Sequence, residues 1–259
     1  MTANMPVLFL GHGSPINAIE DNAWRRGWAE IAARLPRPKA VLCISAHWET
    51  AGASAVSASP HPTTIHDFGG FPQALFDYQY PAPGDPVLAQ QVANLLQPLK
   101  VGLDQQWGLD HGTWSVLAHV FPQADIPVIQ LSIDRTKPAQ FHYDLGKRLA
   151  PLRDEGVLIV GSGNVVHNLG IMNWREQNVA FDWAIRFNDL VKNSLASRDH
   201  APLIGYNSLG KDAELSINSA EHYLPLLYVI GQQNPGDKLT MFTDSIFGGS
   251  ISMLSVSIG

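Results

Sequence analysis

Short apolar runs alternate with amphipathic segments along the chain. Residues 6–10, 40–46 and 156–160 are apolar runs rich in Val, Leu and Ile, and each is followed by Gly, His or Ser residues. Runs of this length with apolar residues at consecutive positions are typical of strands buried on both faces. In residues 22–35 the large apolar side chains recur at spacings of three and four, which predicts an amphipathic helix. By the same criteria we expect helices at 85–99, 112–121, 139–152, 181–196 and 220–230, and strands at 52–58, 126–133, 238–243 and 252–257.

This alternation of strands and helices predicts an α/β fold with a central, largely parallel or mixed sheet covered by helices on both faces. No linker, charge run or internal repeat divides the chain, so we expect residues 1–259 to form a single domain. Residues 59–84 carry prolines, histidines and aromatics without helix or strand periodicity. Long loops of this kind are usually lids or binding loops, and residues 68–80 are our candidate lid. The alternative is a rigid loop packed by its own aromatic side chains.

The composition excludes several classes of protein. Only 15% of the residues are charged and 45% are hydrophobic, which excludes a disordered chain. The net charge is −6 without a basic cluster, so we expect no nucleic-acid partner. We also expect no membrane segment and no signal peptide, and therefore a cytoplasmic protein. The single cysteine, Cys43, excludes a cysteine-based metal site and leaves the ten histidines as the plentiful soft ligands.

Three of the histidines follow apolar strands directly. His12 comes after VLFLG, His47 after VLCISA and His167 after VLIVGSGNV. Because ligands bind at the carboxyl ends of the strands in open α/β sheets, we expect these side chains to converge on one metal or catalytic site. Imidazole ligands with open coordination positions suit either non-haem Fe(II) or catalytic zinc, and the pattern does not choose between them.

Further polar residues are candidates for the same site. His111 interrupts the segment LDHGTW, and His222 lies in NSAEHYLPLL, where Asn218 or Ser219 could cap a helix. The neighbouring Glu221 could bind a metal instead of His222, because only one of two adjacent helical residues points into a given site. Phosphate-loop and nucleophile-elbow motifs are absent. We also note Glu49, and in the long loop His61 and His66, whereas we interpret His119, His142 and His200 as surface or packing residues.

Taken together, these segments resemble the 4,5-DOPA dioxygenase extradiol-like family of the class III extradiol ring-cleavage dioxygenases. The resemblance covers essentially the whole chain. It is carried by FLGHGSP (9–15), ISAHWET (44–50), HPTTIHDFGGFP (61–72), LDHGTW (109–114), GSGNVVHNL (161–169) and SAEHYLPLLY (219–228).

The resemblance implies that His12, His47 and His222 hold a metal. It implies an acid/base role or a further ligand role for His167, and a contact with substrate or oxygen for His111. Class III enzymes typically use two histidines and one glutamate, so the choice between His222 and Glu221 stays open. In the loop, our candidates for substrate binding are His66 and Phe71.

The implied activity is extradiol cleavage of a catechol, DOPA-like in its substrate class, with O2 and Fe(II). Zn(II) is expected to occupy the same site in purified protein, since it binds such sites more tightly. Two alternatives stay open at this point: a zinc-dependent hydrolase using the same histidines, and a Memo-like binding protein without catalysis. The sequence specifies neither the physiological catechol nor the oligomeric state.

Overall fold

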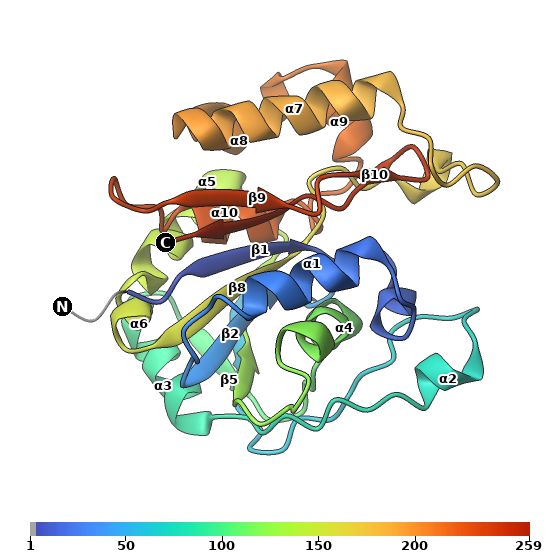
Figure 1. Cartoon of the computed structure of the whole chain (residues 1–259). Coiled ribbons are helices and arrows are strands. Elements are labelled where there is room, and N and C mark those ends of the chain that lie inside the picture. The colour runs from blue at the N-terminus through green and yellow to red at the C-terminus, as the bar shows by residue number, and fades with distance from the viewer. Residues whose placement is uncertain (1–3) are drawn as a thin grey trace.

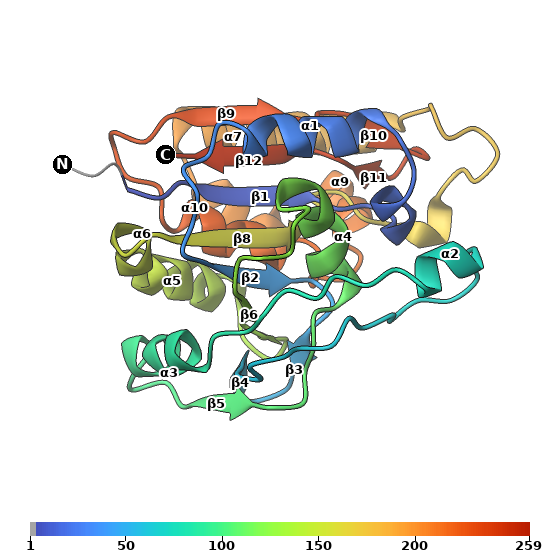
Figure 2. The same cartoon turned by 60° about the horizontal axis from the view of Figure 1, so that its bottom comes forward.

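A six-stranded mixed sheet runs through the molecule in the order β6-β2-β8-β1-β12-β9 (Figure 2). The computed structural model describes residues 4–259. Strands β6, β2, β8 and β1 are parallel, whereas β12 is antiparallel to both β1 and β9. The fold class is therefore confirmed as α/β with a mixed sheet. The strands span Val7–Gly11 (β1), Ala40–Ser45 (β2), Val128–Gln130 (β6), Val157–Gly163 (β8), Leu239–Phe242 (β9) and Ser255–Ile258 (β12).

The apolar runs are buried on both faces because alternate side chains of one strand enter different cores. In β1, Val7 and Phe9 join one core, and Leu8 and Leu10 join the other. On the first face lie α5 (Ala139–Leu149), α7 (Asp182–Ser197) and α10 (Leu224–Ile230). On the second face lie α1 (Ala23–Ala32) and α4 (His111–Val120), in front of the sheet in Figure 2.

Smaller elements complete the architecture around this sheet (Figure 1). Two separate two-stranded parallel sheets, β3 with β7 and β4 with β5, accompany the central sheet. Their bounds are Glu49–Thr50 (β3), Ser54–Ser57 (β4), Val101–Asp104 (β5) and Ile133–Asp134 (β7), and β10 (Ile246–Phe247) pairs with β11 (Ile251–Ser252). The remaining helices are η1 (Pro15–Ala18), α2 (Gln73–Phe76), α3 (Pro86–Leu95), α6 (Pro151–Asp154), η2 (Leu169–Ile171), α8 (Ala201–Ile204), η3 (Tyr206–Ser208) and α9 (Lys211–Ser216).

Several predicted boundaries were wrong for identifiable reasons. The expected strand at 126–133 is two strands, because the chain leaves β2 after Leu131 and the Ser132 N–H donates to the Ala55 carbonyl instead. The expected helix at 220–230 begins only at Leu224, since Pro225 has no N–H to donate to the carbonyl four residues earlier. Neither Asn218 nor Ser219 caps it. The strand β5 and the helix α9 were not predicted.

The long loop at 59–84 contains one short helix, α2, and is otherwise irregular. It extends beside α4 and past the carboxyl ends of the strands (Figure 2). Across residues 4–259, no helix has both the length and the apolar character needed to cross a membrane.

Candidate active site

The carboxyl ends of three neighbouring strands bring the predicted histidines together. Strand β8 lies between β2 and β1, and its residues Ser162 and Gly163 pair with Ser45 and Gly11. The three strands therefore end level with one another. His12 follows β1 directly, and His47 and His167 follow β2 and β8 after short turns. The three side chains therefore lie at one edge of the sheet, and their shared metal or catalytic role stays a prediction.

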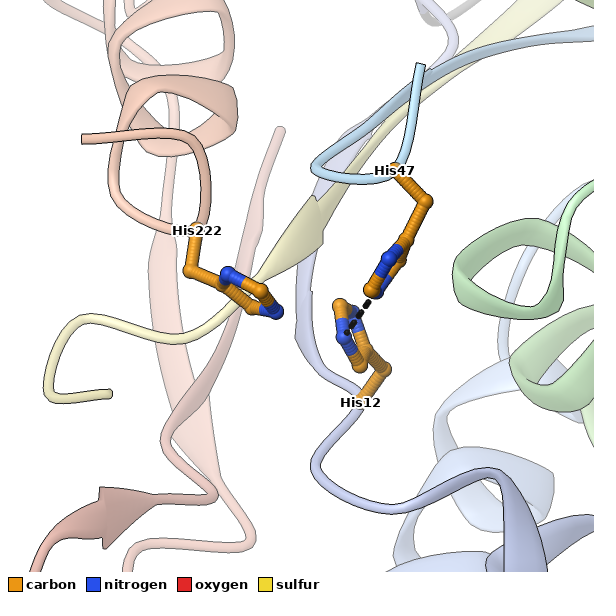
Figure 3. Close-up of side chains that lie close together, drawn as sticks. All are labelled: His12, His47 and His222. Atoms are coloured by element: carbon orange, nitrogen blue, oxygen red, sulfur yellow. Dashed lines mark hydrogen bonds between the residues drawn. The ribbon is translucent and has the colours of Figure 1, made fainter. Parts of the chain in front are cut away.

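His12, His47 and His222 form a compact triangle (Figure 3). One ligand atom from each lies within 4.8 Å of the others. The three pairs of ring centroids are 5.1, 5.2 and 5.1 Å apart, and the Nε2 atoms of His12 and His47 are separated by 3.1 Å. The contact between His12 and His47 is a hydrogen bond when one Nε2 carries its proton, and with both protons on Nδ1 the two lone pairs converge on one point. The donor set fits a metal ion held by three nitrogens.

A polar group faces the Nδ1 atom of each of these rings, within hydrogen-bond distance for His12 and His222. The Ser162 hydroxyl donates to the Gly112 carbonyl, so its oxygen accepts from His12 Nδ1 at 3.0 Å. His222 Nδ1 lies 3.1 Å from Glu221 Oε1, and His47 Nδ1 lies 3.7 Å from Asp67 Oδ2. A proton on Nδ1 leaves the Nε2 lone pair available, which is how metal-binding histidines are usually oriented.

Burial keeps these imidazoles neutral in the metal-free protein. It lowers the pKa of His12 and His222 well below the usual value, and the neighbouring histidines lower it further. Burial, followed by the proximity of His111, lowers the pKa of His47 to about 3. A neutral imidazole is the form that binds metal, so the site is prepared for a cation near neutral pH.

His222 is fixed by the backbone beside it. The Asn164 N–H donates to the His222 carbonyl at 2.8 Å, directly after β8. A Cβ at Gly163 would lie 2.1 Å from that carbonyl oxygen, so only glycine allows this approach. The adjacent Glu221 carboxylate bonds to His222 and accepts from the Ser219 hydroxyl. Glu221 lies outside the three-histidine group but forms a second group with His167 and His222, whose ligand atoms lie within 4.8 Å of one another.

His167 lies against one member of this triangle, His222. Its ring stacks on His222 with centroids 3.5 Å apart and planes inclined by 5°. Its backbone N–H donates to the Ser216 carbonyl at the end of α9. Burial lowers the pKa of His167 to about 4, although the charge of Glu221 opposes that shift.

His111 is the first residue of α4, and the Asp110 carboxylate caps this helix by accepting from the Thr113 N–H. Ser45 and Gln130 also donate to Asp110 at 2.6 Å, which fixes the start of the helix. The His111 ring lies 3.8 Å from that of His47, centroid to centroid.

Asp67 is a site residue that sequence reasoning missed. Its Oδ1 lies 2.9 Å from His111 Nδ1 and accepts from the His111 backbone N–H at 3.0 Å. Burial tends to raise the pKa of Asp67, but the contacts with His111 and His47 outweigh it and the net shift is downward. The signal available was an Asp directly after His66 in a segment already assigned to the site.

A cavity of about 620 Å³ opens beside these side chains, and its size suits a small aromatic ligand. His47, His111, His167 and His222 line it together with two groups of apolar residues. Phe68 and Phe71 come from the long loop, and Leu169, Met172 and Trp174 come from the segment after β8.

Of the predicted substrate contacts, Phe71 lines this cavity and His66 does not. His66 Nε2 contacts the Tyr78 carbonyl at 2.9 Å, within the loop itself. His61 is exposed and also lies outside the lining. The histidines interpreted as packing or surface residues contact other groups: His119 the Asn17 carbonyl, His142 the Tyr228 hydroxyl and His200 the side chains of Tyr143 and Gln233.

Comparison with known proteins places this geometry in a family. Residues 6–228 match the family described as the catalytic LigB subunit of aromatic ring-opening dioxygenase. The 4,5-DOPA dioxygenase extradiol of Escherichia coli K12 is 50% identical over 262 residues, which cover 100% of this chain and 96% of that protein. The protein of the same name from Beta vulgaris is 37% identical, covering 94% of this chain and 92% of its own.

A solved structure agrees with these matches. The crystal structure of an uncharacterized protein from Escherichia coli K12 superposes with a TM-score of 0.86 at 45% identity, covering 98% of this chain and 100% of that one. The enzymes of this family depend on a metal, and the histidine cluster supplies a place to hold one. The resemblance inferred from the sequence motifs is thus confirmed, and the chain belongs to the LigB family of aromatic ring-opening dioxygenases as an extradiol dioxygenase.

Proposed function

We propose that this protein cleaves the aromatic ring of a catechol next to its two hydroxyls, using O2 and an Fe(II) ion held by His12, His47 and His222. One observation carries the proposal: three neutral imidazoles, each with Nδ1 facing a polar partner, converge beside an aromatic cavity. Fe(II) in this place would bind the catechol oxygens and O2 and pass electron density from the ring to oxygen.

The chain's own residues would bind and orient the substrate. Phe68 and Phe71 give the cavity apolar aromatic surface for a catechol ring. Three neutral ligands leave the positive charge of a divalent ion uncompensated, which favours a catecholate over a neutral phenol. The loop at 59–84 would exclude bulk water from the reacting ring.

His167 and His111 would handle protons and oxygen. The His167 ring lines the cavity, which supports a role in taking a catechol proton and returning it to the product. A ligand atom of His167 also lies within 4.8 Å of one from Glu221 and one from His222, so the ligand role stays open as the alternative. Asp67 lies beside His111 Nδ1, which leaves His111 Nε2 to contact substrate or oxygen.

The reaction balances without a further reductant. The carbon–carbon bond adjacent to the diol breaks, and one oxygen atom ends in an aldehyde and the other in a carboxylate. The four electrons needed to reduce O2 come from the ring. The product of simple catechol is a yellow hydroxymuconic semialdehyde.

The test is O2 uptake by protein loaded with Fe(II) under anaerobic conditions and then given catechols in air-saturated buffer. We expect O2 uptake equal to semialdehyde formed, and no uptake with zinc in the same site. Absence of uptake across a panel of catechols would refute the proposal, and oxygen-independent hydrolysis by the zinc form would support the hydrolase instead.

Substitution His167→Ala separates the two roles open to that residue. We expect turnover to be lost while one metal ion per chain is retained, measured by elemental analysis. Loss of the metal would make His167 a ligand instead. A cytoplasmic location also remains a prediction, testable by cell fractionation.

A further inference from the structure

The cavity beside the histidines has an uneven charge distribution. Among its lining residues the only carboxylate is that of Glu20, and neither a lysine nor an arginine lines it. The other polar lining groups away from the histidines are neutral, and they include Asn22, Gln177 and Asn178. A substrate bound here would meet one fixed charge outside the metal site, and that charge is negative.

Glu20 is available to bind a ligand. Among residues 4–259, no ion pair or side-chain hydrogen bond engages its carboxylate, and the residue is exposed. The nearest basic residues along the chain are Arg25 and Arg26, neither of which lines the cavity. Arg26 pairs with Asp21 at 2.9 Å instead.

A chain of hydrogen bonds holds the segment that carries Glu20 relative to the metal site. The Asn17 amide donates to the His12 carbonyl at 3.0 Å, and the Asn22 amide donates to Asn17 Oδ1 at 2.8 Å. Between them, the Glu20 N–H donates to the Ile16 carbonyl. These hydrogen bonds therefore fix the backbone that carries Glu20 relative to His12, one of the three histidines.

Aromatic side chains near this segment also favour a cation. Trp24 and Phe247 line the same cavity and meet edge to face, with centroids 5.4 Å apart. Trp174 lines it from the segment after β8. Indole and phenyl faces attract ammonium groups, and they offer nothing comparable to a carboxylate.

We propose that the cavity selects catechols bearing a cationic amine on the side chain, that Glu20 binds the ammonium group, and that a side-chain carboxylate has no Lys or Arg partner among the lining residues. This inference rests on the proposed catechol cleavage and adds the substrate class to it. A catechol amino acid would form an ion pair with the lining through its ammonium group alone, and a simple catechol amine would bind at least as well.

The test compares three catechols that differ in one terminal group: 4-(2-aminoethyl)catechol, neutral 4-ethylcatechol and 3,4-dihydroxyphenylacetate. We expect kcat/KM to be highest for the amine and lowest for the acid. In Glu20→Gln, the ratio of amine to neutral catechol should fall roughly fivefold, which corresponds to about 1 kcal/mol. Glu20→Lys should reverse the order of the amine and the acid.

Glu30→Gln is the matched control, because Glu30 is an exposed residue of α1 outside the cavity lining. It removes the same charge and should leave the selectivity ratio as in the wild type. Binding of the same compounds to zinc-loaded protein without O2, followed by tryptophan fluorescence, gives a readout that is independent of turnover and should show the same order.

The outcomes distinguish this inference from the proposed function. Turnover of all three catechols at similar kcat/KM, or a Glu20→Gln variant with the wild-type ratio, would refute the role of Glu20 and leave ring cleavage intact. No turnover of any catechol would refute ring cleavage, and the fluorescence titration would then decide the charge preference by itself.

Discussion

Substitution Gly112→Ala should weaken metal binding although Gly112 contributes no side chain to the site. A Cβ at this position would lie 2.8 Å from His47 Cδ2 and 2.5 Å from Ser45 Oγ. Neither atom moves freely, because Ser45 donates to Asp110 and the His47 ring is enclosed by His12 and His111.

The expected size of the effect follows from this distance. Ordinary contact begins at 3.4 Å, so His47 would have to move by at least 0.6 Å from its 2.8 Å position. Metal–nitrogen bonds tolerate changes of only about 0.2 Å. Displacing a ligand in this way should lower metal affinity about 10- to 100-fold, the range seen when the groups supporting a ligand are removed. Overpacking should also lower the free energy of unfolding by about 1–3 kcal/mol.

The assay is competition for Zn(II) against a chromophoric chelator, with circular dichroism to confirm folding. Gly69→Ala is the matched control, because nothing lies within 4 Å of a Cβ there. It should bind metal as the wild type does. A Gly112→Ala protein that is folded and binds zinc with wild-type affinity would refute the claim that close packing against α4 sets the position of His47.

Three further predictions concern the groups around the metal site. Ser162→Ala removes the acceptor of His12 Nδ1 and should lower metal affinity about 10- to 100-fold by the same chelator competition; an unchanged affinity would contradict the proposed orientation of His12. In metal-free protein, burial lowers the pKa of His167 to about 4 and that of His47 to about 3. As the pH falls, these histidines therefore bind protons in the unfolded chain before they do so in the folded protein. The free energy of unfolding should be constant above about pH 6.5 and fall as the pH drops from there toward 4. Urea titrations at several pH values check this, and a flat profile over that window would count against burial of neutral imidazoles. Removing bound metal with a chelator should lower the melting temperature, since a ligand at about 1,000 times its Kd stabilises the fold by about 4 kcal/mol. Scanning calorimetry with and without zinc measures this change, and the same melting temperature in both samples would contradict the metal site.

Sequence reasoning predicted the location of His12, His47 and His167 because it depends on chain topology. Each follows an apolar run, and parallel strands place their carboxyl ends at one edge of the sheet. That argument needs only the order of strands and helices. His222 could not be placed in this way, since it precedes a helix, and family resemblance supplied it.

The supporting groups could not be predicted, because their contacts depend on details of side-chain packing. Ser162 is an ordinary polar residue in the sequence, and only the structure brings it beside His12. Likewise, only the structure brings Ser45 and Gln130 to Asp110, which the sequence places at the start of a helix. His66 and Asp67 are neighbours in one loop, yet the backbone turns Asp67 toward His111 and leaves His66 within the loop. No periodicity in residues 61–72 distinguishes these two directions.

The most direct measurement of the central claim is the fate of ¹⁸O₂ in a single turnover of Fe(II)-loaded protein with a catechol. Mass spectrometry after reductive trapping of the aldehyde should find both labelled oxygen atoms in the opened ring, and His12→Ala, which removes one of the three nitrogens, should form no such product. A ring-opened or hydrolysed product whose new oxygen comes only from water, or full labelling by His12→Ala, would contradict the assignment of this histidine triangle as the centre of an extradiol dioxygenase.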